Sequence, residues 1–170
     1  MTLKAVSRSS RGALRTSRRA RQRGGTATVE LAMVLPVFVM LLFGTLEIGL
    51  MARSSLALGQ IGREAARAMS VGATPSRVQG LIGEISTGIS EQRLSTSLQS
   101  RSWDEATGAW GSWTTLASDG VSNTAASGDQ LRVMLTYEHL LATGGLLADV
   151  FDASDENTVA LDATVVSVRE

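Results

Sequence analysis

The sequence has 170 residues, with sixteen basic residues, sixteen acidic residues, one histidine and no cysteine. Its zero net charge hides an asymmetry, because residues 1–25 hold eight basic residues and no acidic one, whereas residues 26–170 hold eight basic and sixteen acidic residues. This composition excludes disulfides, thiolate metal sites and multi-histidine metal sites. A basic tail joined to an acidic remainder is typical of a chain that works at a membrane or on nucleic acid.

The basic tail, residues 1–23, is dominated by Ser, Arg, Ala and Gly and shows no apolar periodicity. Such a composition predicts a segment without stable structure. No aromatic residue interleaves its arginines and an apolar stretch follows directly, so we expect a membrane partner and no nucleic-acid partner. We therefore assign residues 1–25 to a basic cytoplasmic leader.

The apolar stretch that follows has the length of a membrane span. No charged residue occurs over 31–46, and the apolar sequence resumes after Glu47. A helix rises about 1.5 Å per residue, so residues 31–52 can cross a hydrocarbon core about 30 Å thick. Arginines are dense before this stretch, and Arg53 stands alone in the first ten residues after it. The positive-inside rule therefore predicts a single span, with the N-terminus in the cytoplasm and residues 53–170 outside.

Three residues in and beside this stretch need a reason. Pro36 removes a backbone donor and crowds the preceding turn, which predicts a helix bend. Carboxylates are costly in lipid, about 2.5–3.5 kcal/mol near the bilayer centre and less at its edges. Glu30 is expected at the cytoplasmic edge, and Glu47 is the second carboxylate, expected at the far edge.

Glu30 has two interpretations. It is either solvated at the interface or paired with an amine. If the chain were cut after Gly25, the new amine of Thr26 would lie four residues before Glu30, one helical turn away. The two charges could then neutralise each other, within one chain or between neighbouring chains.

These residues together resemble the start of a known family. Gly25, then Glu30 as the fifth residue after it, then an apolar helix, is similar to the cleavage site of a class III prepilin peptidase. The longer segment resembles TadE-like proteins, which are minor pilins or pseudopilins of Flp-type (Tad) pilus systems. Leu31 follows the glutamate where major Flp pilins favour an aromatic residue, so the resemblance is to the minor branch. The residues that fit the family pattern are Ala27, Val29, Glu30, Ala32, Pro36, Gly44, Glu47, Gly49, Ala65, Ala66, Arg67 and Ala68.

The resemblance implies a type IV pilin-like protein in the cytoplasmic membrane of a prokaryote. It implies cleavage between Gly25 and Thr26, and assembly of a Flp (Tad) pilus or related secretion filament through the N-terminal helix. The implied partners are the prepilin peptidase, other pilin or pseudopilin subunits, the inner-membrane assembly platform and the lipid bilayer. The alternative is a single-pass anchored envelope protein whose outer domain binds a ligand without assembling; the two differ in whether the leader is cut.

The helical pattern continues beyond the span, which predicts one long helix over residues 26–72. Its small residues make one side nearly flat, and small residues let helices approach closely. We expect this side to form a packing seam, either against the chain's own sheet or against another subunit. The seam residues are Gly59, Gly62, Ala65 and Ala66.

Residues 73–170 are expected to form an extracytoplasmic α+β head domain. Thr74 and Pro75 provide a cap and a first-turn proline for a short amphipathic helix. That helix would bury Val78, Leu81, Ile82, Ile85 and Ile89. Alternating patterns then predict an antiparallel sheet of about four strands, the first two as a hairpin. The expected strands are 94–98, 110–116, 130–139 and 158–168.

Residues that could carry chemistry are scarce. His139 is the single histidine and is expected at a strand end, and no nucleophile-elbow glycines surround any serine. We therefore expect no enzyme, no catalytic residue, no metal and no cofactor. Trp103, Trp110 and Trp113 lie on or beside the hairpin and are expected to cover the core; the alternative is an exposed contact edge.

Overall fold

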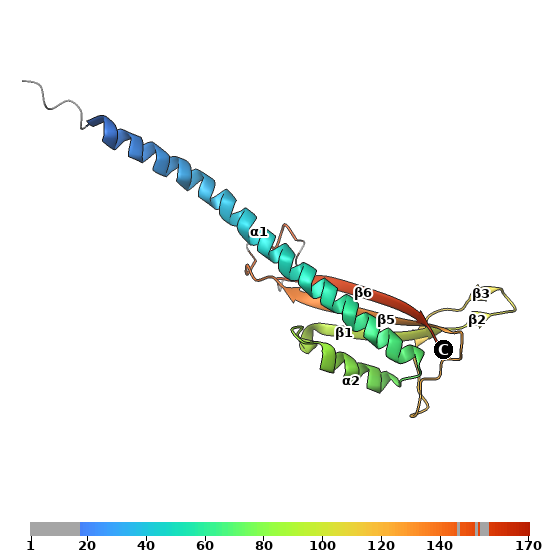
Figure 1. The fold of residues 1–170 in the computed structure, drawn as a ribbon. Helices are drawn as coiled ribbons and strands as arrows, with labels where there is room; N and C mark the ends of the chain where they lie inside the picture. Colours follow the sequence, from blue (N-terminus) through green and yellow to red (C-terminus); the bar gives the residue numbers. More distant parts are fainter. Residues whose placement is uncertain (1–17, 146, 152, 154–156) are drawn as a thin grey trace, which may run out of the picture. The chain divides into compact units, whose positions relative to one another are not determined.

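The computed structural model describes residues 18–145, 147–151, 153 and 157–170, with side chains from residue 25 onward. The chain divides into two compact units, residues 1–42 and 43–170. Helix α1, Arg18–Ser70, begins in the first unit, and the second unit holds the rest of α1 and all other elements (Figure 1). These are α2 Pro75–Ile85, the 3-10 helix η1 Glu91–Arg93, β1 Leu94–Arg101, β2 Trp103–Asp104, β3 Ala109–Trp110, β4 Thr114–Thr115, β5 Gln130–Leu140 and β6 Thr158–Val168.

The predicted α+β class is confirmed. Four strands form one antiparallel sheet in the order β4-β1-β5-β6, and β2 and β3 form a separate two-stranded sheet. The longest pairing joins β5 to β6, from Gln130 opposite Val168 to Leu140 opposite Thr158. β1 pairs with the other edge of β5, and Leu98 lies opposite Val133.

Helix α1 begins earlier and ends slightly earlier than predicted. It starts at Arg18, inside the segment expected to lack structure, because arginine, alanine and glutamine favour helix. The rest of that prediction, for residues 1–17, lies outside the described residues. α1 ends at Ser70, and Gly72 then takes a φ of 95°, a conformation that suits glycine.

Tertiary hydrogen bonds satisfy the carbonyl groups at the end of α1. The Asn123 side-chain nitrogen donates to the Met69 carbonyl at 2.9 Å, and Arg169 Nη1 donates to the Ser70 carbonyl at 2.8 Å. A helix leaves its last four carbonyls without internal partners, and a cation is favourable at that end. These contacts tie the end of α1 to two loops distant in sequence.

Helix α2 begins as predicted and ends before the predicted last apolar position. Thr74 Oγ1 accepts a hydrogen bond from the Arg77 nitrogen at 3.3 Å, and Pro75 opens the first turn. The helix ends at Ile85, and the C-cap residue Ser86 leaves the helical conformation with a ψ of 34°. Its side chain and its nitrogen both donate to the Ile82 carbonyl. Ile89 is buried but lies beyond the helix, so its predicted place on α2 is wrong.

The predicted strand over 110–116 is split into two. β3 ends at Trp110, and Gly111 donates a hydrogen bond to the Ser102 carbonyl at 2.9 Å. The chain then joins the larger sheet at Thr114 and Thr115, which pair with β1. Glycine is a poor strand former and often marks such a change of path.

The core lies between the two helices and one face of the four-stranded sheet. Leu58, Ala65 and Met69 of α1 are fully buried, as is Val78 of α2. The inward side chains of β5 alternate along the strand and complete the core; they are Leu131, Val133, Leu135 and Tyr137. We call the opposite face, which carries the alternate residues of β1, β5 and β6, the open sheet face.

Candidate functional site

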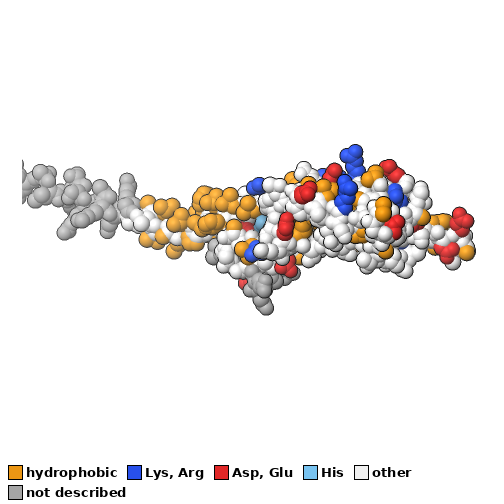
Figure 2. Space-filling model, turned by 90° about the horizontal axis from the view of Figure 1, so that it is seen from below, with side chains coloured by type: hydrophobic (Ala, Val, Ile, Leu, Met, Phe, Trp, Pro, Cys, Tyr) orange, Lys and Arg blue, Asp and Glu red, His pale blue; other side chains and the backbone are white. Residues whose placement is uncertain are grey.

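The N-terminal part of α1 presents apolar side chains to its surroundings. Every side chain from residue 25 to residue 42 is exposed except that of Val39, which is half-buried. Figure 2 shows these hydrophobic side chains along the helix. The helix is long and apolar enough to cross a membrane, judged by length and composition. One N-terminal apolar helix of this kind fits a single-pass membrane protein.

The residues predicted for cleavage and charge pairing lie in the first turns of this exposed segment. Gly25, Thr26 and Glu30 are all helical and exposed. A Cβ at Gly25 would meet nothing within 4 Å. Pro36 lies inside the same helix, which continues through it.

Glu47 differs from Glu30, because the second unit encloses it. Its side chain is 1% exposed, and its Oε1 accepts a hydrogen bond from the Ala142 nitrogen at 2.9 Å. Ala142 follows β5, so this bond joins α1 to the loop after that strand. Gly44, one turn earlier on α1, lies against the same loop. An ideal Cβ built on Gly44 would be 3.9 Å from Leu147 Cδ1. Glu47 thus anchors α1 to the rest of the second unit.

His139, near the end of β5, lies next to this anchor. Its Nε2 is 3.8 Å from Glu47 Oε1, and its Nδ1 is 3.3 Å from Ser54 Oγ on α1. Nε2 is buried and has no hydrogen-bond partner among the described residues. Burial lowers the pKa of His139 below its usual 6.5; the nearby Glu47 raises it, and Arg93 lowers it. The imidazole is therefore favoured in its neutral form.

Three of the four small residues of the predicted seam lie against the chain's own core. Ala65 and Ala66 are buried in the core, and an ideal Cβ at Gly62 would lie 2.9 Å from Val165 Cγ2 on β6. Gly59 is half-buried, with Arg63 as its neighbour. Of the two partners considered for the seam, the structure brings the sheet against Gly62, Ala65 and Ala66.

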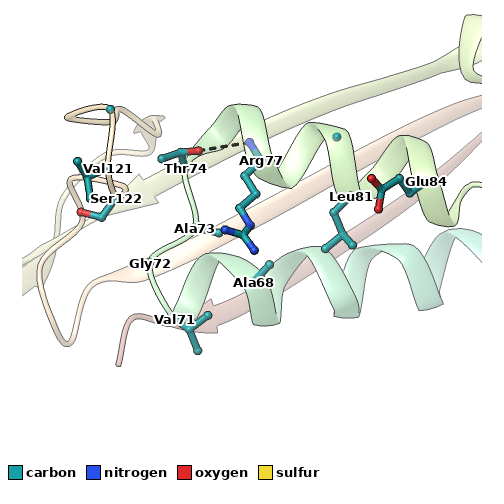
Figure 3. A pocket seen from close by; sticks show the side chains of 12 residues that line it. Ala68, Val71, Gly72, Ala73, Thr74, Arg77, Leu81, Glu84, Val121 and Ser122 are labelled. Atoms are coloured by element: carbon teal, nitrogen blue, oxygen red, sulfur yellow. Dashed lines mark hydrogen bonds between the residues drawn. The ribbon is translucent and has the colours of Figure 1, made fainter.

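A groove opens at the far end of α1. It has a volume of about 1000 Å³ and lies between the α1–α2 turn, one side of α2 and the loop at 120–122. Figure 3 shows Arg77 and Glu84 along its α2 side, with Val71 and Val121 near its other walls. Arg77 and Glu84 carry opposite charges two helical turns apart.

The tryptophans do not take the place predicted for them. None of them belongs to the buried core among the described residues, and Trp103 is 49% exposed. The prediction that they cover the core is wrong. Trp113 instead stacks with Arg101 and Arg132, which belong to the open sheet face. Arginine and tryptophan attract each other through the ring quadrupole, which favours the place of Trp113 on the open sheet face.

Residues 25–67 match the family model described as TadE-like protein. This segment is TadE-like. A search of curated proteins found no match, and neither did a search of solved structures. The match covers residues 25–67, about a quarter of the chain.

The TadE-like segment lies entirely on α1, which ends at Ser70. It covers the predicted cleavage position, Glu30, the Glu47 anchor and the seam. Within this segment, the burial of Glu47 could not be predicted from the sequence, because Ala142 and His139 lie more than 90 positions away. One signal was available: His139 continues the inward alternation of β5, which turns it toward the helices. The sequence named no partner for it.

Proposed function

We propose that the chain is a membrane-anchored minor pilin or pseudopilin that takes part in assembling a Flp (Tad) pilus or related secretion filament. The exposed apolar segment at 25–42 carries this proposal. Glu30 is its one charged residue, and it lies at the start of the TadE-like match.

The segment needs a partner along its length. Eighteen helical residues span about 27 Å, close to the thickness of a hydrocarbon core. Lipid covers such a helix while the subunit is stored in the membrane, and the helices of other subunits cover it after assembly. The proposal gives the chain no catalytic activity.

Glu30 acts in the assembled state, in which the helices of other subunits surround the segment. Cleavage after Gly25 creates an ammonium group on Thr26, and the helix then carries one positive and one negative charge a turn apart. An unpaired charge in an apolar bundle costs several kcal/mol. Pairing the Thr26 ammonium with Glu30, of the same or a neighbouring subunit, removes most of that cost and fixes the axial position of the helix.

The first experiment identifies the mature N-terminus by mass spectrometry of protein from native membranes. The proposal expects Thr26 as the first residue, and a Gly25→Leu variant that keeps about 25 additional residues. A leader that stays attached to the wild-type chain contradicts the proposal. That outcome supports the alternative, an anchored envelope protein that does not assemble.

The second experiment separates membrane insertion from assembly. Glu30→Gln should be inserted and cut normally, yet fail to crosslink with other pilus subunits, because the amide does not cancel the Thr26 charge. Glu64→Gln is the matched control, since Glu64 is exposed on the same helix in the second unit. Glu47→Gln is unsuitable as a control, because Glu47 is buried. Normal crosslinking of Glu30→Gln would leave interfacial solvation as the role of Glu30.

A further inference from the structure

A continuous row of aromatic and cationic side chains runs from the β2–β3 hairpin onto the open sheet face. We call it the tryptophan–arginine row; its members are Trp103, Trp110, Arg101, Trp113 and Arg132. Trp103 and Trp110 pack edge to face, with ring centroids 5.3 Å apart. The Arg101 guanidinium carbon lies 5.3 Å from the Trp110 centroid and 4.5 Å from that of Trp113. Arg132 lies 4.2 Å from the Trp113 centroid on the same ring system.

Glutamines hold both guanidinium groups in place. The register of β1 and β5 puts Arg101 opposite Gln130 and Gln99 opposite Arg132. In each pair the arginine donates from Nε and Nη2 to the glutamine Oε1. The two guanidinium groups are therefore preorganised, and a ligand would order few further rotamers on binding.

The charge of this row is not neutralised within the described part of the chain. No carboxylate there forms an ion pair with Arg101 or Arg132. The glutamines occupy the Nε/Nη2 edge of each group and carry no charge. The other edge of each guanidinium is formed by Nη1 and the second hydrogen of Nη2. This edge matches the two oxygens of a carboxylate, and it makes no hydrogen bond to a described residue.

We propose that the tryptophan–arginine row binds an acidic polysaccharide through the carboxylates of its uronate sugars. Each guanidinium takes one carboxylate by its open edge, and the exposed ring of Trp103 packs against the apolar face of a sugar. Charge complementarity favours this ligand, and two guanidinium groups beside one tryptophan ring suit a polymer with a repeating carboxylate. The proposal stands on the open sheet face and goes beyond the role in the pilus.

Two other anionic partners fit less well. A second copy of the chain would have to bring two of its carboxylates to the two guanidinium groups at once. In its own hairpin, Asp104 already accepts hydrogen bonds from Ala106 and Thr107. Nucleic acid is bound through many phosphate contacts along a cationic track, and this row offers two cations. The polysaccharide needs only those two cations and the aromatic surface.

The test measures binding of an oligogalacturonate of about ten sugars to the full chain in phosphatidylcholine nanodiscs. The methyl-esterified form of the same oligosaccharide is the ligand control, because it keeps the sugars and removes their charge. Arg132→Gln and Trp103→Ala are the test variants, and Arg63→Gln, on the exposed side of α1, is the matched control. Circular dichroism and thermal unfolding establish that each variant is folded.

The proposal expects each test variant to weaken binding at least tenfold, Arg63→Gln to leave it unchanged, and the esterified ligand not to bind. Rising salt should weaken binding further. Equal binding of the esterified ligand would overturn the proposal, as would unchanged affinity in both test variants. Tighter binding of single-stranded DNA to the same row would replace the polysaccharide by a nucleic acid, and self-association abolished by Arg132→Gln would replace it by a second copy.

Discussion

At the scale of single residues, the carboxylates of Glu30 and Glu47 have opposite environments although the sequence makes them look alike. Both border the same apolar stretch. Glu30 is exposed, whereas Glu47 is enclosed by the loop after β5 and by His139. A buried carboxylate is tolerated only where hydrogen bonds and a favourable partner offset its desolvation. The Ala142 N–H provides such a hydrogen bond to Glu47 Oε1 here.

Replacing Glu47 with alanine should destabilise the second unit by about 1–3 kcal/mol, because the Ala142 N–H loses its acceptor. Glu47→Gln keeps an acceptor oxygen and should cost less. Urea unfolding of the full chain in micelles, followed by tryptophan fluorescence, measures both effects. Glu64→Gln should remain within about 0.5 kcal/mol of the wild type. A Glu47→Ala protein as stable as Glu64→Gln would show that the anchor contributes nothing.

The lowered pKa of His139 predicts how stability depends on pH. The unfolded chain takes up a proton near the ordinary pKa of 6.5, whereas the folded chain takes it up only at lower pH, because the imidazole is buried. The free energy of unfolding should therefore be constant above about pH 7 and fall as the pH drops through 6.5 toward the folded pKa. Asp104 and Asp119 have pKa values below 3.8 and do not interfere in this window.

The measurement is the midpoint of urea unfolding between about pH 7.5 and pH 5.5, on the wild type and on His139→Gln. The variant should lose most of the slope in this window. A rise in stability on acidification would mean that protonated His139 pairs with Glu47 strongly enough to outweigh burial. NMR titration of the single histidine measures the same pKa directly.

At the scale of elements, α1 combines two kinds of surface along one helix. Its residues 25–42 are exposed and, apart from Glu30, uncharged, and its Gly62 packs against Val165 of β6 and Leu135 of β5. Glycine is costly inside a helix, by about 1 kcal/mol relative to alanine. Gly62 is retained against that cost because β6 comes so close that no side chain fits.

Gly62→Ala should be destabilising by about 1 kcal/mol, the cost of overpacking less the gain in helix propensity. The new Cβ would lie 2.9 Å from Val165 Cγ2, and a β-branched valine has little freedom to turn away. Gly80→Ala on α2 is the control and should be stabilising by about 1 kcal/mol, since its Cβ meets nothing within 4 Å. Thermal unfolding should show a lower midpoint for Gly62→Ala and a higher midpoint for Gly80→Ala. Adding Val165→Ala to Gly62→Ala should restore part of the loss; failure to do so would assign the effect to another contact.

At the scale of the whole molecule, the separation of charge predicts how the chain is oriented in the membrane. We expect the basic residues of 1–25 to stay on the cytoplasmic side and the second unit to lie outside. The absence of native cysteine allows single cysteines to report this orientation. The placement decides which surfaces, the tryptophan–arginine row among them, meet the environment of the cell.

An impermeant maleimide added to intact spheroplasts should label Ser95→Cys, an exposed position on β1. Ser9→Cys, introduced together with Gly25→Leu so that the leader stays attached, should react only after lysis. The reverse labelling pattern would mean that the N-terminus lies outside and the second unit in the cytoplasm. Labelling of both positions in intact cells would mean that the helix does not span the membrane.

The sequence by itself determined what depends on composition and local periodicity. Local sequence was enough to predict the apolar stretch, the Thr74 cap, the end of α1 near Gly72 and the strands β5 and β6, because each is set by neighbours within a few residues. The TadE-like segment was recognisable for the same reason.

Only the tertiary structure decided which distant residues meet. The burial of Glu47 against Ala142 and His139, the approach of Val165 to Gly62, and the pairing of Arg101 with Gln130 depend on strand register and on how α1 lies on the sheet. The strand at 110–116 was split and the tryptophans stayed at the surface for a similar reason. The hydrogen bond from Gly111 to the Ser102 carbonyl and the stacking of Arg101 and Arg132 on Trp113 are contacts between segments. Periodicity within one segment carries no information about them.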